Sequence, residues 1–260
     1  MNSLKFVMRL NATSCVSFGL LFILMPQTVA LFLGQAPAAV ITALGIGLMG
    51  NGAHLIAASW HAKIRETEVI WFSLGDFSWW LVTLALIVAD LWITTSRGIV
   101  TATIVASGVA CLGVAQLWIL GHQRHGNTNG EHINAIARSW MALPSWVKVW
   151  LAVLNSAFVA AFVFLPDRIA EVTLIAYFAA LPLLAGQVGY DGGLRRILAL
   201  GHLVPWIPFL IWLVTLPDRT TYVALLTIIV AICLAFDAND LRLFAKGERA
   251  IVGKDSSEKT

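Results

Sequence analysis

Charged side chains are scarce in this chain of 260 residues: 12% are Asp, Glu, Lys or Arg, while 59% are hydrophobic. Soluble domains carry roughly a quarter charged residues, so a water-soluble fold would lack the polar side chains needed to cover its surface. The composition excludes that class and predicts an all-α integral membrane protein. The net charge of +3 predicts no nucleic-acid partner, because membrane proteins hold Lys and Arg on their cytoplasmic side without any polyanion.

Cysteine is also rare, and the three thiols are Cys15, Cys111 and Cys233, each inside an apolar run. The absence of a C-x-x-C pair argues against a disulfide framework and against a thiolate metal site. We expect the thiols to pack as small apolar groups. The sequence predicts no metal and no cofactor. A b-type haem is an alternative, since His54 and His202 lie at comparable depth on different predicted helices.

Apolar runs long enough to cross a bilayer, about 20 residues each, occur eight times in the sequence. Pro26 is expected to kink or end the first run, because proline lacks the N–H that a helix interior needs. Turn residues separate the others, such as Asp191-Gly192-Gly193 and Pro217-Asp218. The predicted membrane helices are 7–33, 38–60, 69–91, 98–121, 147–166, 169–188, 195–216 and 220–244.

The positions of Lys and Arg predict how these eight helices are oriented. With the N-terminus inside, the cytoplasmic segments hold fourteen basic residues, and the outer loops hold Arg97, Arg168 and Arg219. This asymmetry matches the positive-inside rule and predicts that both termini are cytoplasmic. We therefore expect a multi-pass protein of a cell membrane, specifically a bacterial inner membrane, with the lipid bilayer as its first partner.

The two ends of the chain share short patterns, which is one argument for two related halves. Leu10-Asn11 leads through an apolar run to Met25-Pro26, and Leu154-Asn155 leads through another to Leu165-Pro166. One interpretation is two parallel four-helix repeats, 1–121 and 146–246, joined by a polar cytoplasmic linker, 122–145, and followed by a cytoplasmic tail, 247–260. Chance similarity between apolar segments is the other interpretation.

Polar side chains occupy the cytoplasmic third of nearly every predicted helix, while the outer two thirds are almost purely apolar. Ionisable groups inside a membrane are costly, so each is a functional candidate. This one-sided layer predicts a polar pocket near the cytoplasm, with Trp80 beside Asp76 adding an apolar wall. The predicted ligand-binding residues are Asn11, Asn51, His54, Asp76, Trp80, Gln116, Asn155, His202 and Asp237. For a single Asn or Gln, interhelical hydrogen bonding is the competing interpretation.

The seventh and eighth predicted helices carry three further expectations. Pro205 and Pro208 are expected to break the regular helix after His202. Asp240 is expected to form a cytoplasmic salt bridge with Arg195 or Arg196. Asp237 lies one turn deeper, where it can join the polar layer.

Three functions are compatible with these patterns. The first is binding, and consequently transport, of a small amphiphilic solute or lipid through a cytoplasm-facing polar pocket. The second is a non-catalytic accessory or scaffold subunit, whose partner would be another membrane protein or a second copy of the chain. The third is an intramembrane enzyme that modifies a lipid, with Asp76 or His202 as the acid–base residue, for which the sequence identifies no nucleophile or metal.

Overall fold

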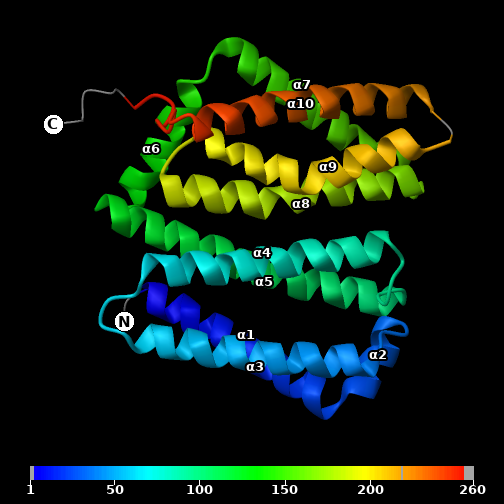
Figure 1. Ribbon diagram of the computed structural model, residues 1–260. Helices are drawn as coiled ribbons and strands as arrows, with labels where there is room; N and C mark the ends of the chain where they lie inside the picture. The colour runs from blue at the N-terminus through cyan, green and yellow to red at the C-terminus, as the bar shows by residue number, and fades with distance from the viewer. Residues whose placement is uncertain (1–2, 218, 255–260) are drawn as a thin grey trace. The chain divides into compact units, whose positions relative to one another are not determined.

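The computed structural model describes residues 3–217 and 219–254 and, within them, is helical with no β-strand. Eight helical segments are long and apolar enough to cross a membrane, which confirms the predicted number. The elements are α1 (Ser3–Leu24), α2 (Pro26–Leu33), α3 (Ala38–Trp60), α4 (Glu66–Val88), α5 (Ser96–His125), α6 (Asn129–Met141), α7 (Ser145–Val159), η1 (Ala160–Phe164), α8 (Arg168–Asp191), η2 (Arg196–Ala199), α9 (Leu200–Thr215) and α10 (Thr221–Ala245) (Figure 1).

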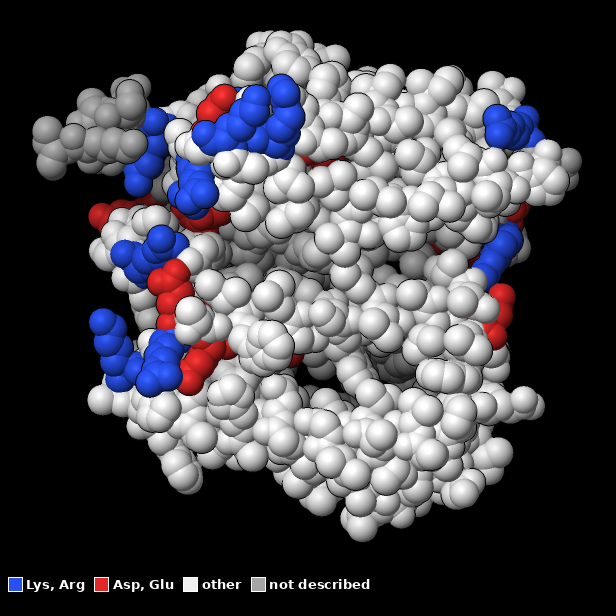
Figure 2. Space-filling view, in the orientation of Figure 1, with Lys and Arg blue, Asp and Glu red and all other residues white. Residues whose placement is uncertain are grey.

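The sides of the helices present large apolar residues rather than charges. Ile104 is 66% exposed and Val163 is 81% exposed, which would be costly in water and is favourable against lipid. In each unit the charged side chains gather mainly at the helix ends (Figure 2). The surface therefore supports a multi-pass membrane protein.

Proline has opposite effects at two places. At Pro26 the first run is interrupted as predicted: α1 ends at Leu24 and α2 begins at Pro26. At Pro205 and Pro208 the prediction of a broken helix is wrong, because both lie inside the continuous helix α9. Proline leaves a backbone carbonyl of the helix without its hydrogen bond. In membrane helices, neighbouring helices and small local changes of the backbone satisfy such groups, so the helix can continue through the proline.

The predicted linker contains a helix of its own. Helix α5 continues to His125, and α6 begins after Thr128, which forms a capping box with Glu131. The Thr128 side chain accepts from the Glu131 backbone N–H, and the Glu131 carboxylate accepts from the Thr128 N–H at 2.7 Å. These hydrogen bonds satisfy backbone donors that the first turn of a helix leaves open.

The chain divides into two compact units, residues 1–120 and 121–260. In the first unit α1 packs along α3 (Figure 1). Gly19 and Gly45 allow this approach, because a side chain on Gly45 would lie 2.9 Å from the Gly19 carbonyl oxygen. In the second unit α9 packs between α8 and α10. The turn after α8 is formed by Gly192, whose φ of 68° suits a residue without a side chain.

Candidate functional site

Three polar side chains from three helices meet in the first unit around the carboxylate of Asp76. The Asn11 amide donates to both carboxylate oxygens, at 3.1 Å and 2.9 Å. The Gln116 amide donates to Oδ2 at 2.9 Å. Asn11, Asp76 and Gln116 were all predicted members of the polar layer, and the structure brings them together across α1, α4 and α5.

This carboxylate centre is sealed from the surface. Asn11 and Gln116 are 0% exposed and Asp76 is 4% exposed. The described hydrogen bonds to Asp76 come from neutral amides alone, and no described Lys, Arg or His forms an ion pair with it. Gly113 allows α5 to lie close to α4, because any larger residue would place its Cβ only 3.0 Å from the Asp76 Cβ. A buried carboxylate is therefore held by dipoles rather than by a counter-charge.

The other predicted residues of this unit lie around that centre or apart from it. Asn51 donates to the Cys15 sulfur at 3.5 Å, and the Cys15 thiol in turn donates to the side-chain oxygen Oδ1 of Asn11 at 3.8 Å. Trp80 is buried, with its indole N–H lacking a hydrogen-bond partner among the described residues. His54 is exposed and stands edge-on to the Phe72 ring, with 4.8 Å between centroids. Among the described residues, the hydrogen bonds to Asp76 come from Asn11 and Gln116 and not from His54.

In the second unit Asn155 is not buried like its proposed counterpart Asn11. It lies on the exposed side of α7, donates to the Leu151 carbonyl at 2.7 Å and accepts from the Tyr177 hydroxyl at 2.6 Å. Asn155 thereby joins α7 to α8. The two asparagines share a sequence pattern but not an environment.

His202 and Asp237 meet between α9 and α10, with 3.2 Å between the imidazole Nδ1 and the carboxylate Oδ2. Cys233, one turn earlier on α10, donates its thiol to the same carboxylate oxygen at 3.6 Å. Donor atoms of all three side chains lie within 4.8 Å of one another. Cys233 is thus part of a polar group and does not serve only as apolar packing. His54 and His202 belong to different units, and the haem alternative stays a prediction.

The predicted salt bridge of Asp240 is confirmed. Asp240 pairs with Arg196, whose guanidinium also contacts Glu248 at 3.0 Å. The neighbouring cation, Arg195, pairs with Asp191 at 2.8 Å. The ion pairs of Arg196 thus hold the end of α10 and the chain after it against the start of η2.

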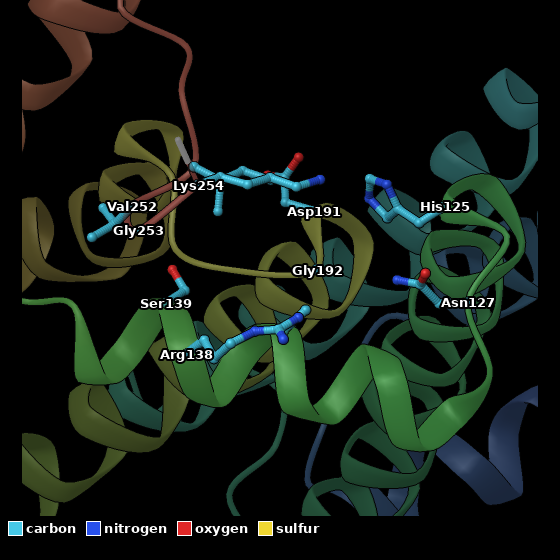
Figure 3. A pocket seen from close by; sticks show the side chains of 11 residues that line it. His125, Asn127, Arg138, Ser139, Asp191, Gly192, Val252, Gly253 and Lys254 are labelled. Atoms are coloured by element: carbon cyan, nitrogen blue, oxygen red, sulfur yellow. The ribbon is translucent and has the colours of Figure 1, made fainter. Parts of the chain in front are cut away.

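A polar pocket of about 70 Å³ lies at the loop end of the second unit. Its walls come from the end of α5, from α6, from the end of α8 and from the C-terminal segment Ile251–Lys254 (Figure 3). Arg138 and Ser139 lie on α6 below the Asp191–Gly192 turn, and Lys254 extends toward His125 (Figure 3). The full lining is His125, Asn127, Ala135, Arg138, Ser139, Asp191, Gly192, Ile251, Val252, Gly253 and Lys254.

Backbone hydrogen bonds frame this pocket. Val252 N–H donates to the Leu194 carbonyl at 2.9 Å, and Leu194 N–H donates to the Ser139 hydroxyl at 2.9 Å. Beneath them the fully buried His132 ring nitrogen Nε2 lies 2.7 Å from the Gly189 carbonyl oxygen. The pocket is thus formed by segments far apart in sequence and tied to one another.

None of the nine predicted ligand-binding residues lines this pocket, and their predicted role stays a prediction. Only one signal in the sequence pointed here: three histidines, His122, His125 and His132, close together in the linker. Their rings are near neighbours, with 6.2 Å from His132 to each of the other two centroids. They do not form a convergent metal-ligand group among the described residues.

Comparison of the chain with known protein families, with curated proteins and with solved structures gave no match.

Proposed function

We propose that this protein binds the anionic head group of a small amphiphile or lipid in the pocket at the loop end of its second unit, and that transport of this amphiphile is the consequence. The observation that carries the proposal is the pocket itself, which places Arg138 and Lys254 around a cavity of about 70 Å³. A cavity of this size holds several waters. It is large enough for a phosphate or carboxylate group.

The charges around the pocket favour an anion. Arg138 and Lys254 contribute positive charge, and His125 adds a ring on the opposite side. The one carboxylate of the lining, Asp191, is already paired with Arg195 at 2.8 Å. No described residue forms an ion pair with Arg138, so its planar guanidinium is available for a bidentate contact with a phosphate or carboxylate.

The helix that forms the floor of the pocket supports an amphiphilic ligand. One face of α6 buries His132 and Ser139 against the unit, and the other exposes Ile133, Trp140 and Met141. An amphipathic helix with exposed Trp and apolar residues is typical of a membrane interface. A head group in the pocket would therefore lie at the level where lipid head groups are found.

The test uses the full-length protein in dodecyl maltoside and measures binding of dodecyl phosphate, with dodecanol and inorganic phosphate as separate arms. We expect saturable binding of dodecyl phosphate that weakens about tenfold or more in Arg138→Gln, since a charge-assisted hydrogen bond contributes about 1.5–3 kcal/mol. The matched control is Arg242→Gln, which removes one positive charge from the last turn of α10 without altering the pocket lining.

Each outcome has a defined meaning. Equal weakening in both variants would indicate non-specific attraction and would overturn the proposal. Binding of inorganic phosphate as tight as that of dodecyl phosphate would identify a free anion as the ligand rather than an amphiphile. Binding of dodecyl phosphate that is unchanged by Arg138→Gln would show that the pocket is not the site.

A scaffold role is the second candidate, and the sealed carboxylate centre of the first unit favours it. Asn11, Asp76 and Gln116 are buried and hydrogen-bonded across three helices, as expected for polar groups that hold a membrane bundle together. A scaffold predicts that substitutions at this centre lower stability and leave dodecyl phosphate binding unchanged. The intramembrane enzyme stays a third proposal.

A further inference from the structure

The group formed by His202, Cys233 and Asp237 has the composition of a transition-metal site. It offers one imidazole nitrogen, one thiol sulfur and one carboxylate oxygen, all within 4.8 Å of one another. Zn²⁺ is bound by these three donor types. Cys233 and Asp237 are four residues apart on α10 and so share a helix face, while His202 is supplied by α9.

The distances within the group match the edges of a coordination sphere. Ligand bonds to Zn²⁺ of about 2.0–2.3 Å place tetrahedral donor atoms roughly 3.3–3.8 Å apart. The His202 Nδ1 and the Cys233 Sγ lie 3.2 Å and 3.6 Å from the Asp237 Oδ2. Two of the three edges are therefore close to the required length, and small side-chain rotations would complete the third.

The imidazole of His202 is held in a fixed plane. It stacks on Trp206, with 4.3 Å between centroids and 18° between planes, and Trp206 stacks on Phe158 at 4.7 Å. The Trp206 indole N–H is anchored to the Ala176 carbonyl at 2.9 Å. This aromatic column orients the Nδ1 toward Asp237. Because the ring is already ordered, less conformational entropy is lost when the side chains bind a metal.

Charge balance also favours a divalent cation in this place. Metal binding releases the thiol proton, so a thiolate, a carboxylate and a neutral imidazole carry a total charge of −2. A divalent ion makes the complex neutral, which suits a segment that spans a membrane, where an uncompensated charge is costly. The nearby Asp240 is already paired with Arg196 and does not disturb this balance.

A nucleophilic cysteine is the competing interpretation, and the geometry disfavours it. Activation of a thiol requires a hydrogen bond to a general base, usually histidine. Here the Cys233 thiol donates to the Asp237 carboxylate, which also contacts His202. The carboxylate lies between the other two groups, as it would in a shared ligand set rather than in a Cys–His pair.

We propose that His202, Cys233 and Asp237 form a Zn²⁺ site between α9 and α10, with a fourth coordination position left for water or a small ligand. His202 and Asp237 have side chains 15% and 13% exposed, so the site is not completely enclosed by protein. Three protein ligands with an open position are typical of catalytic rather than structural zinc. This proposal does not depend on amphiphile binding at the α6 pocket.

Titration of the untagged, metal-free protein with Co²⁺ tests the proposal, because a thiolate ligand to Co²⁺ gives a charge-transfer band in the near ultraviolet. We expect the band to saturate at one equivalent, to disappear in Cys233→Ser and to require about tenfold more Co²⁺ in Asp237→Asn. Cys15→Ser is the matched control, since Cys15 is also buried and hydrogen-bonded but lies in the other unit. Ions held by the linker histidines would give no such band.

X-ray absorption at the zinc edge of the native protein loaded with one equivalent of Zn²⁺ needs no variant and remains informative if Cys233→Ser does not fold. We expect one sulfur at about 2.3 Å with nitrogen and oxygen at about 2.0–2.2 Å. A zinc environment of nitrogen and oxygen alone would overturn the proposal. So would a cobalt band that survives in folded Cys233→Ser.

Discussion

Asn11 donates its side-chain amide to both oxygens of the Asp76 carboxylate, at 3.1 Å and 2.9 Å, in a place where neither residue is more than 4% exposed. This relationship joins α1 to α4 by two hydrogen bonds inside a membrane-spanning unit. It explains how an acidic residue is accommodated there, because the amide replaces part of the water that the carboxylate has lost.

Two substitutions of Asp76 should differ in their effect on stability. Asp76→Asn keeps the shape and can exchange hydrogen bonds with Gln116, whose Oε1 has no hydrogen-bond partner. Asp76→Leu leaves the amides of Asn11 and Gln116 without an acceptor. Each buried amide left without a partner should lower the free energy of unfolding by about 1–3 kcal/mol. We expect thermal unfolding in detergent, followed by tryptophan fluorescence, to show the larger loss for Asp76→Leu. Equal losses would mean that the hydrogen bonds at this centre contribute little.

Replacement by alanine should lower stability by different amounts at Asn11 and Asn155, the two asparagines of the repeated pattern. Asn11→Ala removes two of the three hydrogen bonds to a buried carboxylate and should cost roughly 1–3 kcal/mol. Asn155→Ala removes an exposed contact with Tyr177 and should cost about 0.6 kcal/mol or less, as is common for hydrogen bonds between membrane helices. Unfolding in a denaturing detergent series compares the two. A similar loss in both variants would contradict the difference in burial.

Two glycines of α5 provide a test of helix packing. An alanine Cβ at Gly113 would lie 3.0 Å from the Asp76 Cβ and 3.1 Å from the Phe77 ring, whereas one at Gly108 meets nothing within 4 Å. Gly113→Ala should therefore destabilise the protein by about 1–3 kcal/mol. Gly108→Ala should be neutral or stabilise by up to about 1 kcal/mol through helix propensity. The pair is compared by unfolding midpoint, and a stabilised Gly113→Ala variant would show that α4 and α5 are not in close contact.

The start of α6 should depend on pH through Glu131. Hydrogen bonds from the Thr128 backbone and hydroxyl lower the pKa of Glu131 below its ordinary value of 4.5. A lowered folded-state pKa means that the stabilisation is present above 4.5 and is lost as the pH falls below it through the folded-state pKa. Hydrogen exchange of the α6 amides should be slower in the native chain than in Glu131→Gln at neutral pH.

The same two proteins compared at matched acidic pH provide the control for this effect, because intrinsic exchange rates are then identical. The difference in α6 protection should shrink as the pH falls below 4.5. A difference that stays constant across this range would show that the charge of Glu131 does not stabilise the helix.

Local patterns in the sequence were enough to predict the membrane class, the eight spanning segments and the break at Pro26. Each of these follows from a property of neighbouring residues: hydrophobicity over about 20 positions, or the missing N–H of proline. The same local reasoning was wrong at Pro205 and Pro208, where helix α9 continues. It also missed α6, because the mixed polar composition of that segment is typical of a loop. The helix is recognised only when one of its faces is seen to pack against the rest of the unit.

The candidate sites depended on contacts that no local pattern contains. The layer of polar residues at similar depth identified Asn11, Asp76 and Gln116, but depth does not specify the face of a helix, and His54 and Asn155 lie on exposed faces. The absence of C-x-x-C pairs argued against a thiolate metal site, yet Cys233 meets a histidine from another helix.

The sequence by itself determined that this chain is a membrane protein and where its eight membrane-spanning segments lie, since hydrophobic length acts over a few helical turns. Only the tertiary structure decided which polar groups share a site, because side chains 35 to 65 positions apart meet through the rotation and packing of whole helices. The pocket of the second unit likewise exists only because the chain after α10 returns to contact α6 and the end of α8.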